Sequence, residues 1–116
     1  MKLSEIAIFT DRVDGTVDFY ERLLGVPPTH REEGLAIFES GDVHILIHMN
    51  YEPVDGQPPC ENHTAFAVEN LEAAVANLSS RGIKVEIPPH DYDWGRSAYL
   101  RDPEGRLLEL HEMTNP

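Results

Sequence analysis

With 116 residues, 41% of them hydrophobic, the chain is long enough to enclose one hydrophobic core and too short for two independent domains. Its 21 acidic and 9 basic residues give a formal net charge of −12, which argues against nucleic-acid binding, and its single cysteine, Cys60, excludes an internal disulfide. It contains no apolar stretch long enough to span a bilayer and no signal-peptide pattern, so we expect a cytoplasmic protein without a membrane partner.

The basic residues are unusual in kind. Only Lys2 and Lys84 are lysines, and all the others are arginines. An acidic, lysine-poor surface suits a cytoplasm rich in salt, where screening weakens the repulsion between like charges. The composition therefore suggests a halophilic source, with a mesophile that has an acidic surface as the alternative.

The first half of the chain predicts one helix among several strands. Residues 3–10 are rich in Ile and Phe and predict a strand. Asp14 offers a helix cap, and apolar residues recur at helical spacing from Val17 up to Gly25, a residue typical of the position after a helix end. A double proline then starts an extended segment, which two further strands follow at residues 35–39 and 43–50.

The same order of elements returns after a linker rich in proline and glycine at residues 51–61. A strand is expected at 63–68, Asn70 offers a helix cap, and the helical stripe that follows ends at Gly82. Residues 83–87 are expected to be extended and run into a second double proline. A strand that ends at Arg101 then precedes a type I turn, and residues 106–112 form the closing strand.

The two halves also align weakly in sequence, since residues 5–8 match 63–66 and residues 45–48 match 108–111. We therefore predict an α+β fold of two βαβββ modules within a single domain, 1–116. Their mixed sheet is expected to curl into a cup with the helices on its outer face. The predicted boundaries are module one at about 1–50, the linker at 51–61 and module two at about 62–116.

Strand alternation places three polar residues on the face away from the helices: Glu5, His63 and Glu109. Two carboxylates and an imidazole on one concave face can bind a divalent cation and leave positions open for a substrate. Without a metal, the same groups would be buried charges that need hydrogen-bond partners, or simply a structural histidine and solvated glutamates.

Three segments resemble the signature blocks of the glyoxalase/bleomycin-resistance/dioxygenase family, also called the vicinal oxygen chelate superfamily. They are residues 19–25 (FYERLLG), 63–68 (HTAFAV) and 102–110 (DPEGRLLEL). The resemblance extends over nearly the whole chain and includes the order of the blocks. It implies paired βαβββ modules that form an open cup, often completed in a homodimer.

The resemblance also implies a metal site. The family's ligand positions fall on His63, on Glu109 and, in the first strand, on Glu5, where the family commonly has His. The fourth position, used in glyoxalases and epimerases, falls on Leu46, which cannot bind a metal. We therefore expect three protein ligands, as in the ring-cleaving dioxygenases and the fosfomycin-modifying members. This donor set favours Mn, Fe, Ni or Zn without choosing among them.

Other residues are candidates for a supporting role. His111 is a candidate acid or base beside the metal, or a solvent-exposed residue near the C-terminus. His48 lines the cup or lies on an exposed edge. Arg96 clamps an anionic substrate or pairs with a surface carboxylate. In the family's geometry three aromatic residues form pocket walls, with core packing as the competing explanation: Phe38, Trp94 and Tyr99.

The expected function is that of a divalent-metal-dependent enzyme of this superfamily, of the lyase, isomerase or dioxygenase type, acting on a small oxygen-rich molecule. In this mechanism Glu5 is either a ligand or the base. The first alternative is a homodimeric binding protein of the bleomycin-resistance kind, which sequesters a cationic drug or antibiotic without metal; the net charge of −12 favours it. The second is a subunit whose cup has become a purely structural interface.

Overall fold

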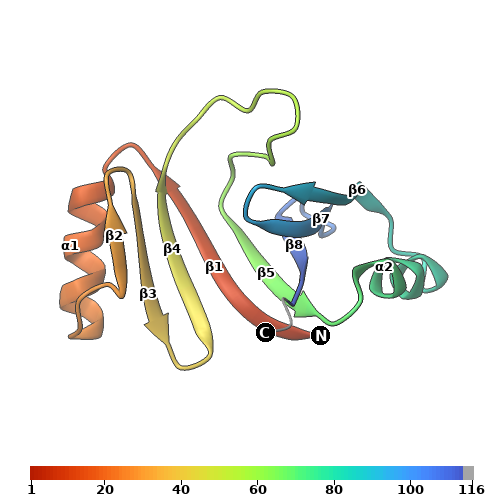
Figure 1. The fold of residues 1–116 in the computed structure, drawn as a ribbon, viewed down its shortest axis with the longest axis horizontal. Helices are drawn as coiled ribbons and strands as arrows, with labels where there is room; N and C mark the ends of the chain where they lie inside the picture. The colour runs from red at the N-terminus through yellow and green to blue at the C-terminus, as the bar shows by residue number, and fades with distance from the viewer. Residues whose placement is uncertain (114–116) are drawn as a thin grey trace. The chain divides into compact units, whose positions relative to one another are not determined.

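The computed structural model describes residues 1–113, which form an α+β fold of two helices and eight strands (Figure 1). It divides into two compact units, one made of Glu5–Asn62 and the other of Met1–Ser4 together with the chain from His63 onward. No helix in the described range is long and apolar enough to cross a membrane. The elements are β1 (Lys2–Thr10), α1 (Val13–Leu24), β2 (His30–Glu32), β3 (Leu35–Ser40), β4 (Val43–Met49), β5 (His63–Val68), α2 (Leu71–Ser80), β6 (Val85–Tyr92), β7 (Gly95–Arg101) and β8 (Leu107–Glu112).

In the first unit the strands lie in the order β2-β3-β4-β1, with β1 parallel to β4 and the other pairs antiparallel. Helix α1 covers one face because its apolar residues recur every three or four positions and point to the sheet. Its buried Val17 packs with Phe38 and Ile47 of the strands. Burial of this stripe, more than the intrinsic propensity of its residues, stabilises the helix.

Helix α1 begins two residues earlier than a cap at Asp14 requires. Arg12 occupies the N-cap without a side-chain hydrogen bond, and Asp14 lies in the first turn. The Asp14 carboxylate accepts from Arg31 at 3.0 Å, and its charge near the helix N-terminus is favourable. At the other end Gly25 adopts the predicted left-handed conformation, with φ of 75°, and its N–H donates to Glu21 O.

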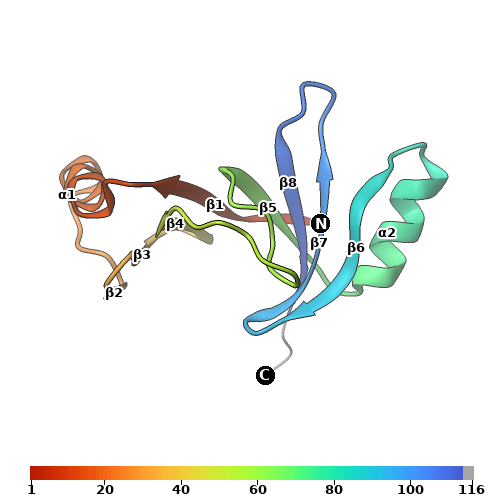
Figure 2. The same cartoon turned by 90° about the horizontal axis from the view of Figure 1, so that it is seen from above.

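The second unit repeats this topology in the order β5-β8-β7-β6, with β5 parallel to β8 and the other pairs antiparallel. Helix α2 lies alongside β6 (Figure 2), and its Leu71 and Leu78 pack on Leu110 of β8. The predicted cap is confirmed, because the Asn70 side chain accepts from Ala73 N at 2.9 Å. The two units therefore have the same βαβββ order, as the sequence predicts.

Strand β6 is longer than the prediction, which ended at residue 87. It continues through Pro88 and Pro89 to Tyr92, with shifts of register against β7. Proline lacks the N–H that a central strand needs, but β6 has a hydrogen-bonded neighbour on one side and tolerates it there.

Candidate metal centre

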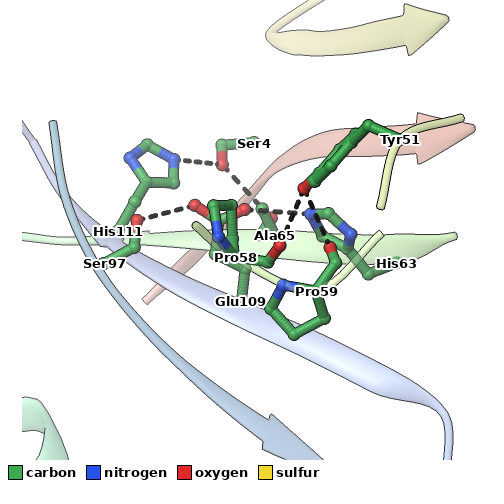
Figure 3. Close-up of polar contacts among 9 residues, drawn as sticks. All are labelled: Ser4, Tyr51, Pro58, Pro59, His63, Ala65, Ser97, Glu109 and His111. Atoms are coloured by element: carbon green, nitrogen blue, oxygen red, sulfur yellow. Dashed lines mark hydrogen bonds and ion pairs between the residues drawn. The ribbon is translucent and has the colours of Figure 1, made fainter. Parts of the chain in front are cut away.

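A buried imidazole and a buried carboxylate meet in the second unit, on the face of its strands opposite α2. His63 Nε2 lies 3.0 Å from Glu109 Oε1, and the two side chains are only 7% and 6% exposed (Figure 3). His63 begins β5, and Glu109 lies in the middle of β8. A charged group this deeply buried needs a partner, which each residue supplies to the other.

The register of the sheet explains why these residues meet. In the parallel β5–β8 pair, Ala65 lies opposite Glu109, and His63 is two residues before Ala65 on the same face. Because the Ala65 side chain is small, the imidazole has room to reach Glu109 along the strand. On the other side of β8, Tyr99 lies opposite Glu109, and its ring contacts the His63 ring edge-on at 5.9 Å.

Ser97 is a third member of this centre that sequence reasoning missed. Its hydroxyl donates to Glu109 Oε2 at 2.7 Å, and the residue is 0% exposed. Figure 3 shows Ser97 and His63 approaching the carboxylate from opposite sides, one at each oxygen. The one sequence signal that could have indicated Ser97 is its spacing from Tyr99, which lies two residues further on and therefore on the same strand face.

Tyr92 is a second residue that the sequence analysis did not select. Burial raises the pKa of its hydroxyl above 10.0, and the nearby negative charge of Glu109 raises it further. Its ring contacts Tyr99 at 6.2 Å and stacks on Trp94 at 5.1 Å with an interplanar angle of 5°. A row of aromatic rings therefore runs from His63 to the exposed Trp94, which is 57% exposed.

The donor atoms of His63 and Glu109 fit a divalent metal. Bond lengths of about 2.1 Å place two neighbouring ligand atoms about 3.0 Å apart at the right angle of octahedral coordination, and about 3.4 Å apart at a tetrahedral angle. The observed separation of Nε2 and Oε1 is 3.0 Å, and imidazole with carboxylate is a donor set that zinc and other first-row ions accept. The two residues would hold such an ion as neighbouring ligands.

The other two predicted ligand positions lie on strands of the first unit. Glu5 is on β1, half-buried and opposite His44 of β4. Leu46 is opposite Ala7, on the same face as Glu5, and its aliphatic side chain offers no donor atom. The role of Glu5 as a third ligand stays a prediction.

His111 follows Glu109 by two residues on the same strand face. Its Nε2 lies 2.6 Å from Ser4 Oγ, which in turn donates to the carbonyl of Ala65 at 3.2 Å (Figure 3). His111 is half-buried and also lines a cavity of about 370 Å³ with Trp94 and other residues of the β6–β7 turn and the end of β8.

The structure corrects the expectation for Phe38. The residue is 0% exposed and packs in the core beneath α1 with Val17 and Ile47, so it does not form an open pocket wall. Strand alternation places Phe38 on the helix face of the sheet. His48 lies on the opposite face of β4, where its ring contacts Phe9 at 5.5 Å and Tyr51 at 5.8 Å.

The remaining substrate-binding candidates lie in the second unit. Tyr99 is buried against His63, whereas Trp94 is exposed at the turn between β6 and β7. Arg96 donates to the carboxylates of Glu72 and Asp91, and these hydrogen bonds raise the pKa of its guanidinium above its ordinary value. Of the two roles expected for Arg96 from the sequence, the structure therefore shows the pairing with surface carboxylates.

The strand order places this chain in the class of proteins built from repeated βαβββ modules, here with a buried His–Glu pair in the second module. Comparison with known families gives the same result: residues 2–110 match the Glyoxalase/Bleomycin resistance protein/Dioxygenase superfamily. The chain belongs to this family, which confirms the resemblance found in the sequence.

Individual relatives extend over almost the whole chain. It is 28% identical to the uncharacterized protein YraH of Bacillus subtilis, over 97% of this chain and 99% of YraH. It is 27% identical to the metallothiol transferase FosB of Shouchella clausii, over 97% of this chain and 80% of FosB. Among solved structures, methylmalonyl-CoA epimerase from Mycobacterium tuberculosis aligns with a TM-score of 0.73 and 21% identity, covering 98% of this chain and 89% of the epimerase. This last similarity is one of fold.

Proposed function

We propose that this protein is a divalent-metal-dependent enzyme that acts on a small oxygen-rich molecule, in a reaction of the lyase, isomerase or dioxygenase type. The observation that carries the proposal is the buried pair of His63 Nε2 and Glu109 Oε1, 3.0 Å apart. These are donor atoms of the right type and spacing for two neighbouring ligands of one ion. FosB, which is named a metallothiol transferase, supports metal use in this family.

Glu5 is proposed as the third ligand. It occupies the first-strand ligand position that the family resemblance assigns, and a carboxylate is a competent ligand for first-row divalent ions. With Leu46 at the fourth position, the protein supplies three ligands and leaves the rest of the coordination sphere for substrate. When bound, Mn, Fe, Ni or Zn supplies Lewis-acid polarisation of a substrate oxygen.

His111 is proposed as the acid–base residue. Because Ser4 has one hydroxyl proton and donates it to the Ala65 carbonyl, its oxygen accepts from Nε2–H of His111. Neutral His111 then has its lone pair on Nδ1, and this is the atom that we propose takes a proton from a substrate. The Ser4 hydroxyl thus selects the tautomer of the base.

Elemental analysis of protein purified without a tag or chelator tests the proposal. We expect about one metal ion per chain in the parent, and its loss in His63→Ala and in Glu109→Ala. The matched controls are His30→Ala and Glu32→Ala, because this pair has the same 3.0 Å separation but is 54% and 59% exposed. A parent that stays metal-free after incubation with Mn, Fe, Ni and Zn would refute the proposal.

A second candidate function is metal-free binding of a cationic aromatic compound. The observation that favours it is the exposed face of Trp94, stacked on Tyr92 beside a cavity of about 370 Å³, in a chain with a net charge of −12. Trp94 is the only tryptophan, so its fluorescence reports directly on this site. Saturable quenching by a cationic dye, but not by an anionic dye of similar shape, is expected if this function holds.

We also propose that the protein acts as a homodimer in the cytoplasm of a salt-adapted cell. Sedimentation velocity tests the dimer. Thermal unfolding in rising KCl tests the salt adaptation, since the 21 acidic residues repel one another less as salt screens them. A protein that is equally stable in dilute buffer would refute the halophile hypothesis.

A further inference from the structure

We infer that Ser97 is a positioning residue that makes Glu109 a one-oxygen metal ligand, and that it thereby selects small first-row ions over larger ones such as Ca²⁺. The inference rests on the proposed metal site and adds to it a determinant of metal selectivity. It follows from the partners of the two Glu109 carboxylate oxygens, since one lies next to His63 and the other accepts a hydrogen bond from Ser97.

The two oxygens of Glu109 have different partners. Oε1 lies 3.0 Å from His63 Nε2, at the spacing of a second ligand on a shared ion. Oε2 accepts the Ser97 hydroxyl at 2.7 Å, the length of a well-formed O–H···O hydrogen bond. Ser97 therefore binds the oxygen that a bidentate ligand would have to offer to the metal.

The backbone keeps Ser97 in this position. Ser97 and Tyr99 alternate along β7 with Ala98 and Leu100, which are buried beneath α2. The antiparallel register with β8 fixes Ser97 beside the strand that carries Glu109. Since Ser97 is 0% exposed, its hydroxyl has no access to water and would be left unpaired if it released Oε2.

The consequence for metal choice follows from ion size. Calcium takes six to eight oxygen ligands at about 2.3–2.6 Å and often binds a carboxylate through both oxygens. Smaller first-row ions accept imidazole and single carboxylate oxygens at about 2.0–2.2 Å. A carboxylate with one oxygen held by a buried hydroxyl therefore suits the smaller ions and penalises calcium.

Calorimetric titration of the metal-free protein with Mn²⁺ and with Ca²⁺ tests this inference. In Ser97→Ala we expect the affinity for Mn²⁺ to fall by about 10–100-fold, because Glu109 loses its orienting partner. The affinity for Ca²⁺ should fall less, so that the preference for Mn²⁺ decreases. The matched control is Ser80→Ala, which removes a hydroxyl that also donates at 2.7 Å, to Asn77 O on the exposed side of α2.

The possible outcomes separate the inference from the proposed function. If the parent binds neither ion nor any other first-row ion, the proposed metal site fails. If the parent binds Mn²⁺ and Ser97→Ala keeps both the affinity and the preference, the metal site stands and the role of Ser97 is refuted. A parent that binds Ca²⁺ as tightly as Mn²⁺ also refutes it, without any variant. Should Ser97→Ala fail to fold, Ser97→Cys, with a weaker donor of similar size, provides the same comparison.

Discussion

The buried His63–Glu109 pair should be energetically coupled in the metal-free protein far more strongly than an exposed pair of the same geometry. An ionised pair 3.0 Å apart attracts with about 5–6 kcal/mol at an effective dielectric constant of about 20, against about 1.4 kcal/mol in water. Desolvation offsets much of the larger figure. Removal of one partner leaves the other buried without it, so we expect each single alanine variant to lose about 3 kcal/mol or more.

The assay is a double-mutant cycle by urea unfolding in the presence of a chelator, with His63→Ala, Glu109→Ala and the double variant. We expect the double variant to be about as stable as the worse single one, which gives a coupling of about 3 kcal/mol or more. The same cycle on His30 and Glu32, also 3.0 Å apart but more than half exposed, should give less than about 1 kcal/mol. Equal coupling in the two pairs would refute the reasoning.

Three further predictions concern a tyrosine beside the site, the core of the first unit and the cap of α2. The Tyr92 hydroxyl should titrate above 10.0 when followed by ultraviolet absorbance, and the midpoint should be lower in Glu109→Gln. Because the pKa of Tyr92 is raised in the folded state, its contribution to stability should be lost as the pH rises through the folded-state pKa. Phe38→Ala should destabilise the protein by about 3–5 kcal/mol in urea unfolding while the metal content of the folded fraction stays unchanged, since Phe38 packs the core. Asn70→Ala should cost about 1 kcal/mol in the same assay, and a neutral result would show that the cap of α2 is dispensable.

Much of the fold is predictable because its rules are local. Alternation along β5 and β8 placed His63 and Glu109 on the face away from α2, and the observed register agrees with that expectation. Asn70 and Gly25 act at helix ends as their residue types predict. The topology itself followed from the order of elements, which is the same in both halves of the chain.

The contacts that complete the site are not local, and the sequence does not specify them. Ser97 reaches Glu109 from another strand, and a serine in a strand has no feature that distinguishes a buried donor from a solvated one. Tyr92 belongs to a stretch beyond two prolines, where the prediction had already ended the strand. Phe38 was assigned by family geometry, although its alternation with Ala36 already favoured the core.

The outermost strands of the two units have consequences for self-association. An exposed strand margin offers free N–H and C=O groups to which another chain can add. Here β2 has only three residues, all polar and exposed, and β6 carries two adjacent prolines and an irregular register. Both features oppose the addition of a foreign strand. At these two margins the protein is protected against aggregation by strand addition, so its association with a second copy is expected to use side-chain surfaces.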